Sequence, residues 1–494
     1  MKVFKLQNVN SSQAKYLQLA ETVRCAIRQG QLAAGDKLPS VKSISEDLSL
    51  NRHTVMKSLA ELVAEGWIES VQRVGYKVVP NLPIEKSLSK SQNQISSHVA
   101  DIDSHMGFRF VRSGTPLPTY PANDFKYNFS GGQPDLALFP FDEFKRCMSD
   151  VLSRPDETQL SYGHSAGTPE LIAQVKIYLR KSRAITEREI VITNGSQEAL
   201  FIVAQLLLKI GDKVAVEELG YPPAMSAFSS TGAELVGVKQ DAQGMCPDDL
   251  AIQILKGNVR LIYLTPLHQY PTTVTLSVSR RMAIYQLAAQ HNIPIVEDDY
   301  DHEFHYRCQP LAPMASSDPA QLVIYLSTFS KIMFPGARIG IMAVSKVMAN
   351  AVSEYRLLIC HKSNVLMQAA LAKWMSNGGF ERHLRRSTRV NLQRRDHAIS
   401  VLNKYACFEF DIPDGGMALW VKLKQATGAN LGVCSAEWLT QKCQEIGIYI
   451  QHEKQYQLNK KRERDCFIRL GFAGMSENKF ADGITLLVNC LNSN

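Results

Sequence analysis

The chain has 494 residues and a mass of 55.1 kDa, which is more than one typical domain, so we expect two or three structural units. Its 45% hydrophobic and 21% charged residues are typical of a globular protein and exclude a disordered or fibrous chain. The formal net charge is +8, and residues 1–80 contribute +4 of it, from 11 Lys and Arg against 7 Asp and Glu. This asymmetry is compatible with a nucleic-acid partner near the start of the chain.

The ten cysteines are scattered, with no CxxC pair and no Cys/His cluster of metal-ligand spacing. We therefore expect neither a metal site nor a disulfide framework.

Residues 1–10 contain no apolar signal segment, and the longest apolar stretches, such as 201–208, are too short to span a bilayer. The sequence thus predicts a cytoplasmic protein with reduced thiols and no membrane partner.

The first 80 residues predict a winged helix-turn-helix. An apolar stripe at helical spacing runs from Tyr16 to Ile27 and ends near Gly30. Ser40 is placed to cap a second helix over 41–48, and Asn51 to cap a third that stops before residue 66. Short strands over 68–70 and 76–79, with a turn between them, would form the wing. The second member of the helix pair would enter the major groove of double-stranded DNA.

The third predicted helix carries polar residues opposite its apolar stripe, and these can contact phosphates and base edges. A solvated face on a small helical domain is the alternative. The string "LPSVKSISEDLSLNRHTVMKSLAELVAEGWIE" resembles the GntR-type winged-helix signature over its whole length. That resemblance implies binding to an operator DNA. The predicted DNA-binding residues are Ser40, Lys42, Arg52, His53, Thr54, Lys57 and, in the wing, Arg73.

The rest of the chain divides into a linker and a second domain. Residues 81–124 are polar, with serine-rich sequence between two proline-containing ends, and predict a linker. From 125 to 494, β-branched apolar runs alternate with helical patterns, which predicts an α/β domain with a mainly parallel sheet. Four predicted strands, 214–216, 261–264, 293–296 and 322–326, each lead to polar residues. Because ligands of open α/β sheets bind beyond the carboxyl ends of the strands, we expect these residues to converge on one site.

Lys331 follows the last of these strands, where its amine could form an imine with an aldehyde cofactor. Most lysines simply lie on the surface. The string "STFSKIMFPGARIG" also supplies Thr328, Ser330 and Arg338 as phosphate ligands, a combination similar to fold-type I pyridoxal-phosphate enzymes. The turn "TNGSQ" would present the backbone N–H groups of Gly195, Ser196 and Gln197 to the same phosphate, unless it merely caps a buried helix.

The resemblance implies further roles around pyridoxal 5'-phosphate. A carboxylate keeps the pyridine nitrogen protonated, and Asp298 is preferred for this, although Asp299 stays open. Tyr300 would lie near the phenolic oxygen and Tyr221 would stack on the ring. Tyr221 could otherwise be core packing, and Arg469, expected to bind a ligand carboxylate, could be a surface ion pair. The predicted cofactor-binding residues also include His268 and Tyr162. Tyr162 would reach the cofactor of a neighbouring subunit, which implies a homodimer.

Nearly the whole chain resembles the MocR subfamily of GntR-type regulators, through strings such as "NFSGGQPDLALFPFDEF", "TPLHQYPT" and "PDGGMALW". The resemblance implies a winged helix joined to a fold-type I aminotransferase-like domain. At Ala166, Leu219, Met225 and Thr273 the chain departs from the residues that are common in this family. We expect these positions to lie near the cofactor or effector pocket. We predict a pyridoxal-phosphate-dependent transcriptional regulator that senses an amino compound, or the cofactor itself, through an aldimine at Lys331. The alternative is an active aminotransferase with a DNA-binding arm.

Overall fold

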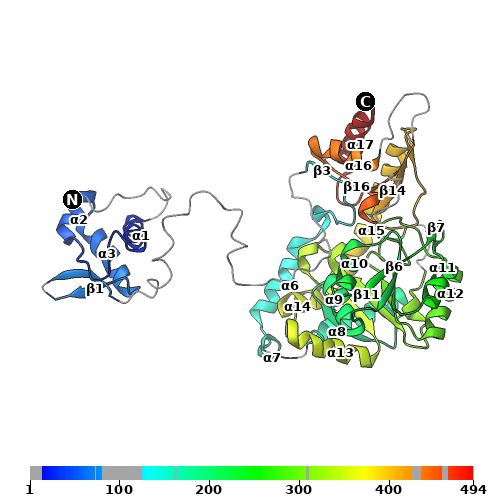
Figure 1. Cartoon of the computed structure of the whole chain (residues 1–494), viewed down its shortest axis with the longest axis horizontal. Helices are drawn as coiled ribbons and strands as arrows, with labels where there is room; N and C mark the ends of the chain where they lie inside the picture. Colours follow the sequence, from blue (N-terminus) through cyan, green and yellow to red (C-terminus); the bar gives the residue numbers. More distant parts are fainter. Residues whose placement is uncertain are drawn as a thin grey trace. The chain divides into compact units, whose positions relative to one another are not determined.

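The computed structural model describes residues 14–72, 74–80, 125–161, 163, 165–306, 311–424, 435–458 and 466–492. The chain divides into two compact units, residues 1–111 and 112–494 (Figure 1). The predicted linker over 81–124 lies outside the described residues. Among the helices that are described, none is long and apolar enough to cross a membrane.

The N-terminal unit is a three-helix domain with a two-stranded wing. Leu19 and Val23 of the first helix pack against Leu59 and Leu62 of the third. Ser40 and Asn51 cap the second and third helices by accepting the backbone N–H groups of Ser43 and His53 at 3.2 and 2.9 Å. The elements are α1 (Lys15–Arg28), α2 (Val41–Leu48), α3 (Arg52–Ala64), β1 (Ile68–Val71) and β2 (Gly75–Val78).

A seven-stranded sheet forms the centre of the C-terminal unit. All its strands run parallel except β12, which is antiparallel to both neighbours. The mainly parallel sheet predicted from the sequence is therefore confirmed. In spatial order the strands are β4 (Glu189–Thr193), β12 (Gly340–Val344), β11 (Val323–Thr328), β10 (Ile295–Asp298), β9 (Val259–Leu264), β5 (Lys213–Glu217) and β6 (Glu234–Val238).

Both faces of this sheet are buried beneath helices. In β4, Ile190 and Ile192 belong to one apolar cluster and Val191 to another, because successive side chains of a strand point to opposite faces. Figure 1 shows the helices packed around the sheet. They are α6 (Phe141–Ser153), α7 (Glu157–Leu160), α8 (Pro169–Arg183), α9 (Ser196–Leu207), α10 (Pro222–Ser229), α11 (Pro247–Leu255), α12 (Val278–His291), α13 (Lys346–Ile359) and α14 (Val365–Ser376), with a small hairpin of β7 (Gln240–Asp241) and β8 (Gly244–Met245).

A second, smaller layer has its own apolar core around Phe129, Leu470 and Leu487. Its antiparallel sheet has the order β13-β14-β17-β16, and β3 pairs with β15 beside it. This pairing brings together two strands that are far apart in the sequence. The elements are β3 (Tyr127–Asn128), α15 (Gly379–Leu402), β13 (Phe408–Glu409), β14 (Ala418–Leu423), α16 (Ala436–Glu445), β15 (Ile448–Tyr449), β16 (Gln451–His452), β17 (Phe467–Gly471) and α17 (Glu477–Asn492).

Thr273, one of the departures noted in the sequence, adopts a strained backbone conformation. Its φ is +64°, in the left-handed region that β-branched residues strongly disfavour. The residue is buried, and its N–H donates to the carbonyl of Gln269 at 2.7 Å, which holds the turn closed. The backbone here suits glycine, which adopts positive φ without a steric penalty.

We expect Thr273→Gly to raise the free energy of unfolding by up to about 1 kcal/mol, because the relief of left-handed strain outweighs the extra freedom of glycine in the unfolded chain. Thermal melting of the full chain measures the change. Thr273→Ala is the control, since it keeps the Cβ atom that causes the strain. Equal destabilisation by both substitutions would show that the turn is not strained.

Candidate functional site

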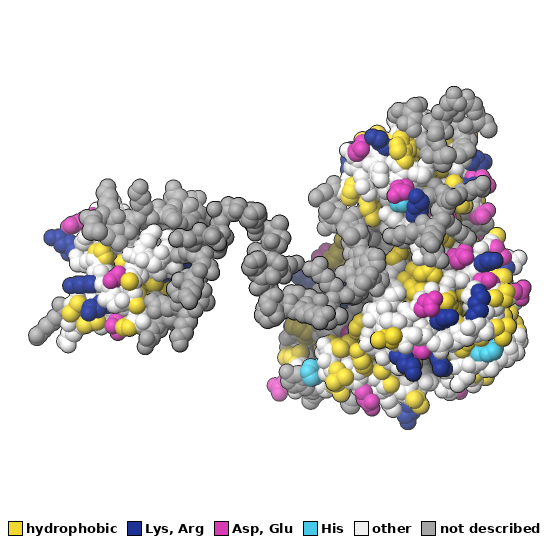
Figure 2. Space-filling model, viewed as in Figure 1, with side chains coloured by type: hydrophobic (Ala, Val, Ile, Leu, Met, Phe, Trp, Pro, Cys, Tyr) yellow, Lys and Arg dark blue, Asp and Glu magenta, His cyan; other side chains and the backbone are white. Residues whose placement is uncertain are grey.

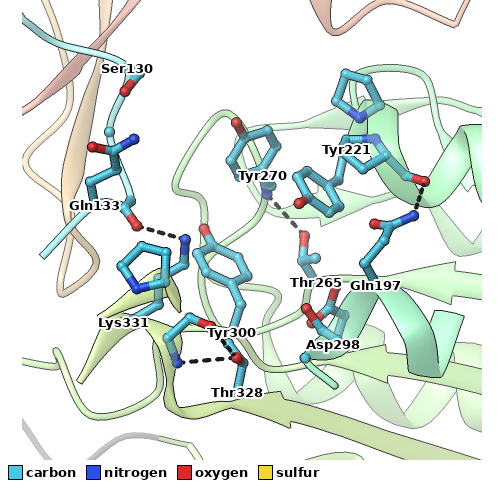
Figure 3. A pocket seen from close by; sticks show the side chains of 18 of the residues that line it. Ser130, Gln133, Gln197, Tyr221, Thr265, Tyr270, Asp298, Tyr300, Thr328 and Lys331 are labelled. Carbon is cyan, nitrogen blue, oxygen red and sulfur yellow. Dashed lines mark hydrogen bonds between the residues drawn. The ribbon is translucent and has the colours of Figure 1, made fainter. Parts of the chain in front are cut away.

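A cavity of about 300 Å³ lies at the carboxyl ends of β9, β10 and β11 and beside the start of α9. Figure 3 shows Lys331 and Tyr300 near its centre, with Ser130 and Gln133 to one side and Tyr221, Gln197 and Asp298 to the other. The structure thus brings residues from many parts of the sequence to one place. The predicted site residues that line the cavity are Gly195, Ser196, Gln197, Tyr221, Asp298, Tyr300, Thr328, Ser330, Lys331 and Arg338.

Lys331 ends the short 3-10 helix Phe329–Lys331 that follows β11. Its Nζ donates to the carbonyl of Gly132 at 2.6 Å. Burial, reinforced by the positive charge of Arg469 and opposed by two nearby aspartates, lowers the pKa of Lys331 to about 8. A larger fraction of the amine is therefore neutral near physiological pH than for an ordinary lysine, and the neutral amine is the nucleophile.

Asp298 is the last residue of β10 and is buried. Its Oδ2 accepts the hydroxyl of Tyr263 at 3.0 Å, whereas its Oδ1 has no hydrogen-bond partner among the described residues. Burial raises the pKa of Asp298 to about 7, and the Tyr263 hydroxyl opposes this rise. An acceptor atom without a partner on a residue that lines a cavity fits the protonated nitrogen of a pyridine ring.

Asp299 does not line this cavity. Its Oδ2 accepts the hydroxyl of Tyr325 at 2.6 Å and forms ion pairs with His302 and Arg183 at 2.8 and 3.6 Å. Burial alone would raise the pKa of Asp299, but His302 and Arg183 together hold it well below its usual range. Of the two neighbouring aspartates, Asp298 lines the cavity and Asp299 does not.

One end of the cavity is suited to an anion. No side chain caps α9, and Gly195 precedes it with a φ of +85°. A Cβ atom at Gly195 would lie 3.2 Å from the guanidinium group of Arg338, whose Nη2 donates to the carbonyl of Asn194 at 2.5 Å. The hydroxyls of Thr328 and Ser330 are 3.0 Å apart at the same end. A helix N-terminus, an arginine and hydroxyls together are typical of a phosphate site.

Arg469, on β17, is only 1% exposed and is not itself among the residues that line the cavity. Its Nη1 donates to the carbonyl of Ser130 at 2.8 Å, and its guanidinium carbon lies 4.5 Å from the centre of the Tyr270 ring. The Nε atom has no hydrogen-bond partner, and no ion pair of this arginine occurs, within the described ranges. A buried cation without a carboxylate partner suits an anionic ligand group.

Some predicted residues lie elsewhere. His268 is not among the cavity-lining residues, since its ring pairs with Asp301 at 2.7 Å. It supports the site indirectly, because its carbonyl accepts the hydroxyl of Tyr300 at 3.0 Å. Tyr162 and Arg73 fall outside the described residues.

Other residues of the site were not singled out from the sequence. The glycines of "SGGQP" are a signal for one group, since a turn of this composition allows close approach of the backbone. The tyrosines and glutamines near residue 450 carry no comparable local signal. The additional residues at the site include Ser130, Gly131, Gly132, Gln133, Tyr263, Tyr270, Tyr449, Gln451, Gln455 and Tyr456.

The polar face of α3 remains accessible in the N-terminal unit. Arg52 and His53 are exposed at the start of the helix and Thr54 is partly exposed. Lys57 is exposed, and its Nζ lies 4.1 Å from the centre of the Tyr16 ring. On the neighbouring helix, Lys42 is also exposed. Figure 2 shows Lys and Arg side chains at the surface of this unit, as expected for a surface that contacts phosphates.

Comparison with known proteins identifies both units. Residues 15–78 match the family described as bacterial regulatory proteins, gntR family. The chain is 31% identical to the probable rhizopine catabolism regulatory protein MocR of Rhizobium meliloti, over 83% of this chain and 82% of that protein. The chain belongs to the MocR family of GntR-type regulators.

Other relatives support the same architecture. The HTH-type transcriptional regulator TauR of Rhodobacter capsulatus is 26% identical over 96% of each chain. The kynurenine aminotransferase of Pyrococcus horikoshii, solved in complex with PMP, superposes with a TM-score of 0.68 at 26% identity, over 75% of this chain and 91% of that chain. This MocR-family chain is thus a transcriptional regulator in which a GntR-type winged helix is joined to a fold-type I aminotransferase-like domain.

Proposed function

We propose that this regulator binds pyridoxal 5'-phosphate in the cavity of its C-terminal unit and that its affinity for operator DNA changes when an amino compound reacts there. The observation that carries the proposal is the presence of Lys331, Asp298 and Arg338 around one cavity. These are a nucleophilic amine, a carboxylate with one oxygen free and an anion-binding guanidinium. The DNA-contact surface lies in the N-terminal unit.

The residues fit the cofactor group by group. Asp298 Oδ1 would accept the ring N–H, and the ring of Tyr221 would lie against the pyridine face, with Tyr300 near the phenolic oxygen. The start of α9, Ser330 and Arg338 would hold the phosphate. When bound, pyridoxal phosphate supplies an aldehyde that condenses reversibly with primary amines and a protonated ring that withdraws electrons.

Arg469 is the reason to expect an acidic group on the effector in addition to its amine. Arg469 and Lys331 donate to the carbonyls of Ser130 and Gly132, two residues apart in a segment that lines the cavity. A compound with an amine and a carboxylate can therefore engage both groups at once, whereas an amine without an acid leaves Arg469 unpaired. A ligand shifts a regulator only if it binds the two states with different affinity, so turnover of the ligand is not required.

A titration of the full chain with primary amines tests the proposal. Cofactor absorbance reports reaction at Lys331, and fluorescence anisotropy of labelled operator DNA reports binding. We expect a carboxylated amine to change both signals and its matched decarboxylated analogue to act far more weakly. Arg469→Ala should raise the half-maximal concentration about 10- to 100-fold, as for the loss of a charge-assisted hydrogen bond, without preventing cofactor attachment. Arg52→Ala is the control, since it should weaken operator binding and leave the absorbance response unchanged.

Absorbance changes with no effect of any amine on operator binding would contradict the proposal. Cofactor alone, added without amine, distinguishes a regulator for which pyridoxal phosphate is itself the signal. A working aminotransferase is the second candidate, favoured by the 26% identity to the kynurenine aminotransferase of Pyrococcus horikoshii. Sustained keto-acid formation at roughly 1–1000 turnovers per second would support that alternative.

A further inference from the structure

Two neighbouring aspartates are each held by a tyrosine from a different strand. Tyr263 of β9 donates its hydroxyl to Asp298, and Tyr325 of β11 donates its hydroxyl to Asp299. β9 and β11 flank β10, with Tyr263 opposite Val296 and Tyr325 opposite Glu297 in the register. Both tyrosines are buried, with 2% and 0% exposure. The two hydroxyls therefore make equivalent contacts to carboxylates with different surroundings.

The other partners of each aspartate determine how strongly its carboxylate depends on the tyrosine hydroxyl. Asp299 also pairs with Arg183 and His302, so its carboxylate is held by several groups at once. For Asp298, by contrast, the Tyr263 hydroxyl is the one side-chain hydrogen bond found within the described ranges. Loss of a single tyrosine hydroxyl should therefore change the position and protonation of Asp298, but not those of Asp299.

We propose that Tyr263 is a positioning residue for the cofactor: it fixes Oδ2 of Asp298 and leaves Oδ1 as the oxygen without a partner. This inference rests on the proposed binding of pyridoxal phosphate. A charged Asp298 accepts the ring N–H, whereas a protonated Asp298 offers a donor where an acceptor is needed.

The expected pH dependence follows from the groups around Asp298. Burial raises its pKa to about 7, and the Tyr263 hydroxyl works against this rise. Removing the hydroxyl should raise the pKa further, so a larger fraction of Asp298 is neutral near pH 7 and cofactor affinity returns only at higher pH. The other groups that act on the pair are Asp299 and Asp301 on the same segment, Lys331 after β11, and Glu217 and Tyr221 near Tyr263.

The test compares Tyr263→Phe with Tyr325→Phe in the full chain. The dissociation constant of pyridoxal phosphate is measured by absorbance titration from about pH 6 to about pH 9, a range that spans the ionisation of Asp298. For Tyr263→Phe we expect the affinity profile to move to higher pH by about one unit, with roughly tenfold weaker binding near pH 7. Tyr325→Phe also removes a buried hydroxyl but should leave the profile of the wild-type chain unchanged.

A double-mutant comparison separates positioning from a packing defect. In Asp298→Asn the carboxylate is absent, so adding Tyr263→Phe should produce no further shift with pH. The inference fails if Tyr263→Phe reproduces the wild-type profile, if Tyr325→Phe shifts it equally, or if the shift persists in the Asp298→Asn background. A wild-type chain that binds no pyridoxal phosphate at any pH would instead overturn the proposed function.

Discussion

Lys331→Ala should abolish covalent attachment of pyridoxal phosphate, because no other amine occupies the position of Lys331 Nζ in the described part of the cavity. The winged helix has its own apolar core and should still fold and bind operator DNA. Borohydride reduction followed by peptide mapping measures the attachment. In the wild-type chain we expect a reduced adduct on the peptide that contains Lys331 and, in the variant, no adduct.

Lys373→Ala is a matched control, since Lys373 is an exposed lysine of α14 that pairs with Asp150 at 2.8 Å. Its adduct should be indistinguishable from that of the wild-type chain. An adduct on a different lysine in the wild-type chain, or a full adduct in Lys331→Ala, would refute the assignment of the attachment site.

Arg183→Met should destabilise the C-terminal unit by about 3–5 kcal/mol, the usual cost of removing one partner from a buried ion pair. The guanidinium group is fully buried, pairs with Asp299 and Glu303, and donates from Nε to the hydroxyl of Tyr325 at 2.5 Å. Methionine fills similar space but removes the cation that Asp299 and Glu303 share, and His302 then remains beside Asp299 alone. Chemical denaturation followed by near-ultraviolet circular dichroism measures the loss.

Lys176→Met is the control on the same helix. Lys176 pairs with Glu189 at 3.1 Å, but both side chains are nearly half exposed, so the loss should stay below about 1 kcal/mol. Similar losses for both variants would mean that the buried pairs of Arg183 with Asp299 and Glu303 do not stabilise the C-terminal unit.

Periodicity and local turn signals were sufficient to predict much of the fold. The N-terminal helices, the four strands that lead to the site and the mainly parallel sheet follow from side-chain spacing, because burial of one or both faces leaves a regular pattern. Side-chain spacing alone did not decide between Asp298 and Asp299, and the preference for Asp298 came from the family resemblance. Consecutive residues at a strand end point in opposite directions, and the sequence does not say which direction faces the cavity.

Two parts of the site depend on distant contacts. His268 follows a strand toward the cavity, but its pairing with Asp301 turns the ring away, and this partner is 33 residues later. Tyr449, Gln451 and Tyr456 reach the cavity because the smaller layer packs beside the main sheet. The ends of the predicted strands locate one edge of the sheet. They specify neither the direction of each side chain nor which second layer packs against that edge.

Lys331 and Arg469 already donate hydrogen bonds to the backbone. Lys331 holds the carbonyl of Gly132 and Arg469 holds that of Ser130, so one short segment is tied to the site at two adjacent points. Any ligand that takes these donors must compete with that backbone and displace it or share the donors. This segment lies a few residues after position 125, where the described part of the C-terminal unit begins. A ligand that engages Lys331 and Arg469 is therefore expected to exchange its own hydrogen bonds with those now made to Gly132 and Ser130.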